Sequence, residues 1–210
     1  MAGTWSIFWR AFAKPSTAYA ELTSGKGSVR RAIYYMLIPI IGYTVMYVFL
    51  TIGHGAPSVF TPWLNTSLES YYAVNRLLLA PSLFIAWLTA TGVIWLLAGS
   101  QEVEPDFGKL LSSIGLAISI SMCAGLLHDL PMSFLSAIGV LDARQHEADM
   151  NSDTVWRTLL WIAYGIYFLL ILIHFPIAVK TATGMGGLRS RLTGWTGFII
   201  FQLIFLVFNR

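Results

Sequence analysis

The polar side chains that could do chemistry gather in one stretch, residues 128–153, between two long apolar segments. Histidines and carboxylates together can bind a divalent metal, and this stretch holds both beside one arginine, at His128, Asp129, Asp142, Arg144, His146, Glu147, Asp149 and Asp153. Their spacing matches no helix-borne pair such as HExxH. The sequence therefore favours a solvated acidic loop, and it leaves open whether His128, His146, Glu147 and Asp149 bind a metal.

Two further features could bind a ligand. His174 lies inside an apolar segment just before Pro176, where a neutral imidazole bonded to a neighbouring helix is favoured over a titrating or ligand-binding residue. Residues 184–187, Gly-Met-Gly-Gly, lie beside Arg189 and Arg191 and could bind phosphate, but a flexible turn is the simpler interpretation. The chain contains no P-loop, GxSxG or Rossmann glycine motif. We therefore predict a non-enzymatic protein with no catalytic residue, cofactor or resident metal.

Long, nearly charge-free apolar segments must position these residues, at 32–52, 77–98, 110–127, 159–179 and 195–208. Four of them reach the roughly 18–20 residues that cross a ~30 Å hydrocarbon layer. The fifth is short, about 25 Å from Leu192 to Phe208, which leaves open an incomplete crossing. Hydrophobic residues make up 56% of the chain and charged residues 11%, with a mean hydropathy of +0.68. The sequence therefore predicts an all-α integral membrane protein, a bundle of five transmembrane helices.

The amino-terminal segment differs from the spans. We divide the chain into a cytoplasmic interfacial segment, residues 1–30, and a single five-span bundle, residues 31–210. Trp5, Phe8, Trp9 and Phe12 fall on one face of a helix. An aromatic face beside basic residues suits the membrane interface. The alternative, with equal weight, is that these aromatics pack against the bundle.

Basic residues set the expected orientation, because cytoplasmic loops retain Lys and Arg near span ends. One side of the predicted membrane carries nine of them: Arg10, Lys14, Lys26, Arg30, Arg31, Lys109, Lys180, Arg189 and Arg191. The other side carries four: Arg76, Arg144, Arg157 and Arg210. We therefore expect a bacterial inner (cytoplasmic) membrane protein with its amino terminus in the cytoplasm and its carboxyl terminus outside. The net charge of +3 reflects this topology and gives no reason to expect nucleic-acid binding.

The spans differ in their small residues and prolines. In the third, Ala117, Ser121 and Gly125 repeat every four residues, and small residues let helices approach closely. We therefore expect this span to be the most enclosed helix. Prolines are expected to bend other spans, at Pro39, Pro81 and Pro176, and a bent packing helix is favoured over a substrate cavity. Residues 132–141 are expected to form a short helix on the outer surface.

Two stretches resemble bacterial members of the Yip-one domain family (Ypt-interacting proteins). One is WRAFAKPSTAYAEL at residues 9–22, and the other is EPDFGKLLSSIGLAISISMCAGLL at residues 104–127. The family's plan of five spans with the amino terminus inside matches the topology predicted above. Eukaryotic relatives bind prenylated Rab GTPases in vesicle trafficking. Their motif and their long hydrophilic amino-terminal region are missing here, so the resemblance implies neither GTPase binding nor any catalytic residue.

These features lead to one leading hypothesis and two alternatives. The leading hypothesis is a non-enzymatic bundle in the lipid bilayer, an accessory, assembly or membrane-organising factor that binds another membrane protein, a second copy of itself or lipid. The first alternative is a small transporter or channel for a neutral or lipophilic solute, built around the bent spans. The second is a metal-dependent membrane enzyme that uses His128 and His146.

Overall fold

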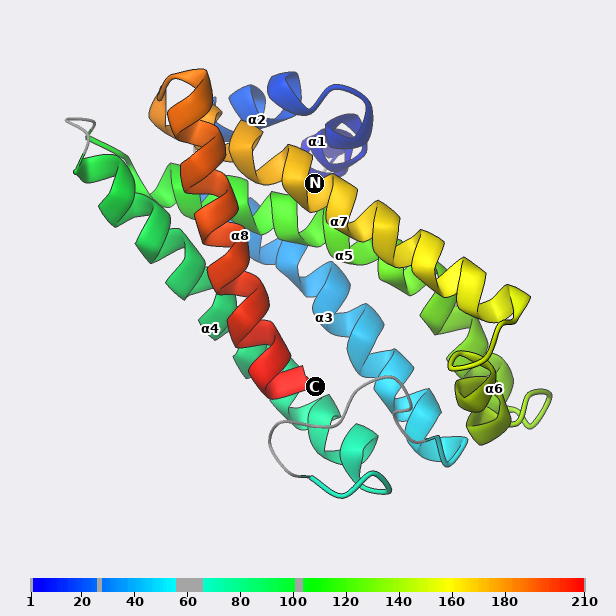
Figure 1. The fold of residues 1–210 in the computed structure, drawn as a ribbon. Helices are drawn as coiled ribbons and strands as arrows, with labels where there is room; N and C mark the ends of the chain where they lie inside the picture. Colours follow the sequence, from blue (N-terminus) through cyan, green and yellow to red (C-terminus); the bar gives the residue numbers. More distant parts are fainter. Residues whose placement is uncertain (1, 26–27, 56–65, 101–103, 210) are drawn as a thin grey trace.

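The computed structural model describes residues 2–25, 28–55, 66–100 and 104–209, and in these ranges every regular element is an α-helix (Figure 1). The helices run in the order α1 Ala2–Ala13, α2 Pro15–Ser24, α3 Ser28–Ile52, α4 Tyr71–Gly99, α5 Phe107–Ala137, α6 Ala143–Asp149, α7 Val155–Thr183 and α8 Gly187–Asn209. Helices α3, α4, α5, α7 and α8 are long and apolar enough to cross a membrane. The predicted five-span, all-α membrane architecture is confirmed.

Two predicted boundaries are wrong. The fifth span is not short: α8 has 23 residues, about 35 Å at ~1.5 Å per residue, because its helix begins before the apolar run and includes Arg189 and Arg191. Residues 132–141 do not form a separate surface helix, since α5 continues through Pro131 to Ala137. Ser133 and Ser136 are buried against the bundle, so tertiary packing keeps this last part of α5 helical.

Helix α5 is the centre of the bundle, as predicted. In its most apolar 18-residue window 78% of the residues are buried, against 22–44% in the other four spans. It packs mainly against α3 and α7, while α8 packs against α4 and α7 (Figure 1). The small residues explain the close approach, since a β-carbon on Gly115 would lie 2.8 Å from the Trp87 ring.

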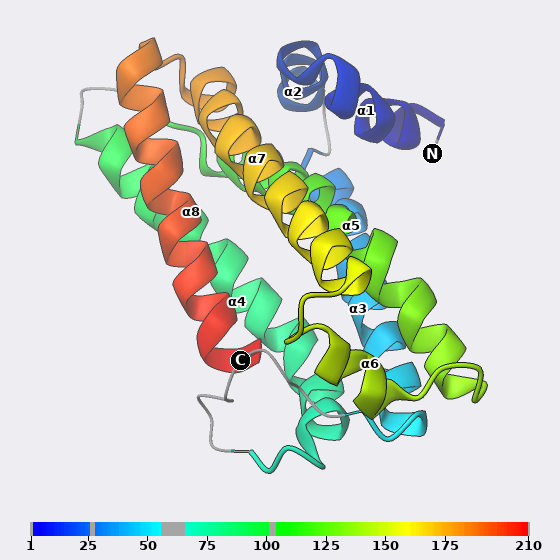
Figure 2. The ribbon, with the colours of Figure 1, turned by 45° about the vertical axis from the view of Figure 1, so that its right-hand side comes forward.

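Helices α7 and α8 meet at a tight turn and then diverge. Gly184 ends α7 with φ +75°, and its amide donates to the Lys180 carbonyl at 2.8 Å; glycine adopts this left-handed conformation without strain. Further along, a β-carbon on Gly194 would lie 2.8–2.9 Å from backbone atoms of Phe175 and Pro176. The two helices therefore touch through their backbones near the turn, and both ribbon views show them separating beyond it (Figures 1 and 2).

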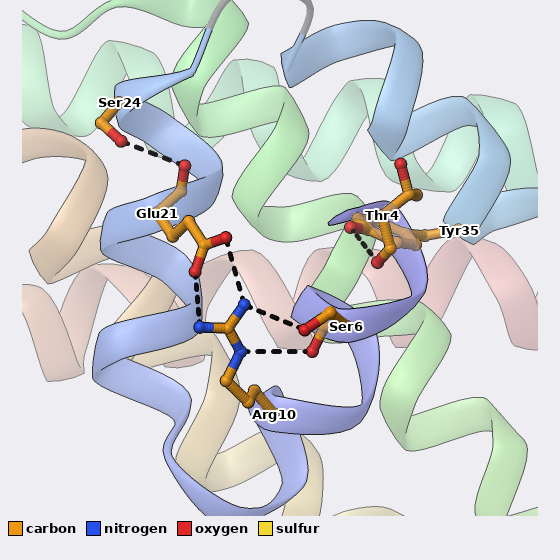
Figure 3. A network of polar contacts seen from close by, with 6 residues as sticks. All are labelled: Thr4, Ser6, Arg10, Glu21, Ser24 and Tyr35. Carbon is orange, nitrogen blue, oxygen red and sulfur yellow. Dashed lines mark hydrogen bonds and ion pairs between the residues drawn. The ribbon is translucent and has the colours of Figure 1, made fainter. Parts of the chain in front are cut away.

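Helices α1 and α2 form a compact pair around Pro15, which occupies the first position of α2. The Arg10 guanidinium holds Glu21 through two contacts, at 2.8 and 3.1 Å (Figure 3). The Tyr35 hydroxyl on α3 donates to the Thr4 carbonyl at 2.9 Å (Figure 3). These bonds hold α1 against α2, and α1 against the first span, α3.

The aromatic face of α1 has one residue packed against the bundle and three exposed, so it combines the two predicted arrangements. Phe8 is buried, with its ring centroid 5.9 Å from that of Tyr35. Trp5, Trp9 and Phe12 are exposed, at 52%, 65% and 42%. The amino-terminal helix is therefore amphipathic as predicted: one aromatic packs on the bundle, and three present a surface suited to the headgroup region.

His174 is bonded to a neighbouring helix, as predicted, although that helix is α2 rather than another span. Its Nδ1 lies 2.9 Å from the Tyr19 hydroxyl, and both side chains are buried. Burial raises the pKa of Tyr19 well above its usual value. The hydroxyl therefore stays protonated and can donate a hydrogen bond to the imidazole. This bond ties the amino-terminal pair to α7.

The two ends of the bundle carry different charges. We call the end with α1, α2 and the α7–α8 turn the basic end; its described basic residues are Arg10, Lys14, Arg30, Arg31, Lys109, Lys180, Arg189 and Arg191. The opposite end, which we call the α6 end, has Arg76, Arg144 and Arg157. Lys26 and Arg210, which also entered the predicted charge bias, lie outside the described residues.

Candidate functional site

A cavity of about 410 Å³ lies in the α6 end, among α3, α4, α5, α6, α7 and α8. Its volume is within the ~300–1,000 Å³ range of small-molecule sites. Half of its described lining residues are aromatic or methionine: Tyr43, Tyr47, Tyr71, Tyr72, Trp161, Tyr164, Tyr167, Phe168, Phe205, Met46, Met122, Met132 and Met150. Aromatic rings supply large apolar contact areas, and methionine adapts to irregular ligands.

Helices α7 and α8 both contribute side chains to the wall of this cavity. The Tyr167 hydroxyl donates to Gln202 Oε1 at 2.7 Å and bridges the two helices. Trp161 on α7 and Phe205 on α8 also line the cavity. Trp161 and Phe168 are 52% and 41% exposed, so the cavity wall continues onto the apolar outer surface. A molecule dissolved in the bilayer could therefore reach the cavity between the two helices.

Polar groups gather where the cavity meets α6. His128 Nδ1 lies 2.7 Å from Asp129 Oδ1, and the His128 side chain is only 10% exposed. The rings of His128 and His146 stack with centroids 5.9 Å apart. The Tyr72 hydroxyl donates to Glu147 Oε1 at 2.8 Å. Helix α5 therefore supplies one half of this polar cluster and α6 the other, with α4 holding α6 through Tyr72.

Two buried nitrogens in the cluster have no hydrogen-bond partner among the described residues: His128 Nε2 and His146 Nδ1. If His128 Nδ1 donates to the Asp129 carboxylate and the ring carries no second proton, its Nε2 is an acceptor. An unsatisfied buried polar atom costs about 1–3 kcal/mol. These nitrogens are therefore the atoms to which a ligand could add a favourable bond.

The cluster contains two carboxylates and a histidine whose pKa is lowered. Burial lowers the pKa of His146 below its usual 6.5, and nearby His128 lowers it further, against smaller opposing effects of Asp149 and Asp129; His146 is therefore mostly neutral at pH 7. No lysine or arginine is among the described residues that line the cavity, whereas Asp129 and Glu147 both are. The polar end of the cavity therefore combines two carboxylates with two histidines.

The structure brings together some of the predicted site residues and separates the others. His128 and Asp129 lie within α5, so the prediction that they belong to a solvated loop is wrong for both; they meet His146 and Glu147 at the cavity. The remaining four lie elsewhere, at Asp142, Arg144, Asp149 and Asp153. Asp142 caps α6 and Asp153 pairs with Arg157. Within the described residues, no three His, Cys, Asp or Glu side chains are arranged to hold a metal ion.

Sequence reasoning missed the aromatic wall of the cavity. Tyr43 and Tyr47 lie four residues apart on α3, and Trp161, Tyr164 and Phe168 lie three and four residues apart on α7. This spacing places each set on one helix face. The recurrence of aromatic residues at helical spacing, within spans that are otherwise uniformly aliphatic, could have predicted this wall.

The prolines that suggested a cavity do not form this one. Pro39, Pro81 and Pro176 are absent from its described lining, and each lies inside a continuous helix. The interpretation of Pro176 as part of a packing helix is confirmed by its contact with Gly194. The cavity arises from the separation of two helices and not from a bend in one.

Comparison with known proteins adds no relative from which a function could be transferred. No protein-family model, curated protein or solved structure matches this chain. The resemblance to bacterial Yip-one domain proteins stays a prediction from the sequence. The function must therefore be argued from the geometry of the cavity.

Proposed function

We propose that this protein is a non-enzymatic, five-span membrane protein that binds one lipid-like amphiphile in the cavity between α7 and α8, and so acts as an accessory or membrane-organising factor. The observation that carries the proposal is an aromatic cavity that continues onto the apolar surface and ends in a buried polar cluster. An amphiphile has matching parts. Its chain would contact the aromatic and methionine side chains, and its head group would bond to His128 and His146.

The depth of the polar cluster supports this orientation. His128 is 21 residues along α5 from Phe107, about 32 Å at ~1.5 Å per residue. The hydrocarbon layer of a bilayer is ~30 Å thick. If α5 enters the hydrocarbon near Phe107, the cluster lies at the depth of lipid headgroups in the opposite leaflet. A bilayer amphiphile could then enter sideways without taking its head group into hydrocarbon.

A matched pair of α7 variants tests the proposal. Leu160 is buried and lines the cavity, whereas Ile162 is 54% exposed and does not line it. We expect Leu160→Trp to fill the cavity and Ile162→Trp to leave it unchanged. Each protein would be purified in nanodiscs, and bound amphiphiles would be counted by native mass spectrometry. The wild type and Ile162→Trp should retain one amphiphile, and Leu160→Trp should lose it.

The same experiment has a clear negative result. Equal retention by the three proteins, or none by the wild type, would contradict binding in this cavity. If Leu160→Trp fails to fold, as judged by its gel-filtration profile, Leu160→Ala provides a second test. This smaller side chain enlarges the cavity and should retain a bulkier amphiphile.

A small transporter for a lipophilic solute is the second candidate, and the lateral opening favours it. Transport requires access from both sides, yet Phe175 and Phe201 are fully buried on the basic-end side of the Tyr167–Gln202 bond. Movement of an amphiphile between the leaflets of liposomes by the pure protein would support transport. Binding without such movement would support the accessory role.

We also propose that the basic end faces the cytoplasm of a bacterial cell and that the protein lies in the inner membrane. The support is the greater number of basic residues at that end. Cysteines introduced beside Arg191 should be protected from impermeant reagents in intact cells. Labelling from outside would mean that the protein has the opposite orientation. Association with another membrane protein or a second copy would appear as a stoichiometric companion in the same purification.

A further inference from the structure

We propose that the polar end of the cavity binds one soft, monovalent metal ion, Cu(I), through two imidazole nitrogens and two thioether sulfurs. The four ligands would be His128, Met132, His146 and Met150, which all line the cavity. The inference goes beyond the proposed function, because a metal site at this cluster does not depend on amphiphile binding. An ion and an amphiphile head group would compete for the same two nitrogens.

Two copies of one short pattern supply these ligands. A histidine is followed four residues later by a methionine at 128–132, His-Asp-Leu-Pro-Met, and again at 146–150, His-Glu-Ala-Asp-Met. Side chains four residues apart lie on the same face of a helix. The first copy lies within α5, and in the second the Met150 amide donates to the His146 carbonyl at 3.2 Å. Each copy therefore places an imidazole and a thioether on one helix face.

The separation of the two imidazoles suits one shared ion. The ring centroids of His128 and His146 are 5.9 Å apart. A metal binds an imidazole nitrogen at ~2.0–2.1 Å, and the ring centre lies ~1.1 Å behind that nitrogen, so two imidazoles on one metal have centres at most roughly 6.4 Å apart. The observed separation is within this limit. Helices α5 and α6 thus hold the two rings within reach of a single ion.

The nitrogens of these rings are open, and one ring already has the support that a metal ligand needs. The His128 side chain is only 10% exposed, and its Nε2 and His146 Nδ1 are buried without a partner among the described residues. His128 Nδ1 lies 2.7 Å from Asp129 Oδ1. Metal-binding histidines commonly donate their other ring N–H to a carboxylate, which orients the ring and raises its basicity. Asp129 is therefore paired with His128 and would position it.

The sulfur atoms determine which metal suits the site. Met150 is buried and Met132 is partly buried, at the same cavity as the two histidines. Within the described residues, no three His, Cys, Asp or Glu side chains are grouped to hold a metal, so two imidazoles need other ligands to complete a site. Thioethers are soft ligands that favour Cu(I), and imidazole also binds copper. Ca²⁺ and Mg²⁺ require oxygen ligands instead.

A metal titration tests the inference on the full-length protein in nanodiscs. Cu(I) would be added without oxygen in competition with the coloured chelator bicinchoninate, and Zn(II) would be titrated separately against a zinc indicator. We expect one Cu(I) per protein and Zn(II) binding about a hundredfold weaker, because thioethers favour the softer ion. X-ray absorption at the copper edge should show sulfur as well as nitrogen ligands.

Methionine variants locate the site. Met132→Leu and Met150→Leu keep an apolar side chain of similar size and remove the sulfur, and each should weaken Cu(I) binding about tenfold, or ~1.4 kcal/mol. Met185→Leu is the matched control, because Met185 is buried near the α7–α8 turn and does not line the cavity. Gel filtration checks that each variant folds, and either cavity variant tests the inference if the other fails to fold.

The outcomes separate this inference from the proposed function. Unchanged Cu(I) affinity in either folded cavity variant, no sulfur signal at the copper edge, or equally tight binding of Zn(II) would each overturn the metal site. A protein that retains an amphiphile and binds no Cu(I) would leave the proposed function standing alone. A protein that binds Cu(I) and retains no amphiphile would leave the metal site standing alone.

Discussion

The two ends of the bundle differ in whether their buried histidine nitrogens have a described hydrogen-bond partner. At the basic end, His174 Nδ1 is bonded to the Tyr19 hydroxyl at 2.9 Å. At the α6 end, His128 Nε2 and His146 Nδ1 are buried without a described partner and lie beside a cavity. A satisfied polar pair fixes how helices pack, whereas an unsatisfied one beside open space is ready to bond a ligand. The difference supports our proposal that the basic end has a structural role and the α6 end binds a ligand.

The amino-terminal helices explain how the basic end is closed. Helix α2 places Tyr19 against His174, and α1 places Phe8 against Tyr35. At the α6 end the described residues contain no corresponding pair of helices, and the seven-residue α6 lies beside α7 (Figure 2).

The largest effect is expected at the crossing that both ends share. Gly194→Leu would force a side chain against the backbone of Phe175 and Pro176, which cannot move aside as a flexible side chain can. We expect a loss of roughly 3 kcal/mol or more in stability, because overpacking at this crossing pushes α7 and α8 apart. The thermal midpoint in detergent, followed by size-exclusion chromatography after heating, measures it.

Gly165→Leu on α7 is the matched control, since a β-carbon at Gly165 meets no atom within 4 Å. Its midpoint should stay near that of the wild type. Equal loss in both variants would show that the crossing has no special role and that leucine is tolerated poorly anywhere on these helices.

A smaller effect should be confined to the basic end. Tyr19→Phe removes the hydroxyl and leaves His174 Nδ1 buried without its partner, at a cost of about 1–3 kcal/mol. Hydrogen exchange should rise in α1 and α2, while amphiphile binding at the α6 end stays unchanged. Tyr34→Phe, which removes an exposed hydroxyl bonded to Arg30, should alter neither. Weaker amphiphile binding in Tyr19→Phe would mean that the two ends are coupled.

The membrane architecture was predictable because it depends on composition along the chain. The five apolar runs and the enclosed third span, with its small residues near Gly125, follow directly from hydropathy and size. Boundaries were harder, since α8 continues through Arg189 and Arg191 and α5 through Pro131. Hydropathy indicates which residues suit the hydrocarbon layer. A helix, however, ends where its backbone hydrogen bonds end, and packing extends both helices beyond their apolar runs.

The candidate site was only half predictable. The chemistry of His128 and His146 was visible in the sequence, but their proximity depends on α6 folding back over α5. The cavity depends on the angle between α7 and α8, which is fixed by the backbone contact at Gly194. No pattern within one helix encodes the angle between two, so the sequence could not show that Trp161 and Phe205 face one space.

A pH effect on stability is expected from His146 at the α6 end. Because the pKa of His146 is lowered in the folded state, mainly by burial and then by His128, with Asp149 and Asp129 opposing, the unfolded chain takes up its proton first. The contribution of His146 to stability is therefore intact above about pH 6.5 and declines as the pH falls toward the lowered pKa.

Thermal midpoints between pH 7.5 and 5 measure this decline, which we expect to be smaller than the loss in Tyr19→Phe because His146 is only partly buried. His146→Phe keeps a ring stacked on His128 and should make the profile less steep. His54→Asn, at an exposed position, should leave the slope unchanged. An unaltered slope in His146→Phe would place the titrating group elsewhere.

The smallest effects concern the exposed ion pairs, one at each end. Arg10 and Glu21 form a two-contact clamp between α1 and α2, with side chains about 40% exposed, whereas Arg157 and Asp153 share one contact four residues apart. Exposed pairs contribute little because water screens the charges. A double-mutant cycle with Arg10→Met and Glu21→Gln should give a coupling free energy below about 1 kcal/mol. A cycle with Arg157→Met and Asp153→Asn should give a smaller coupling, because this pair has a single contact and joins only neighbouring residues at the start of α7. If the second cycle gives the larger coupling, ion pairing rather than burial would hold the α6 end together, and the contrast between the two ends would need a different physical basis.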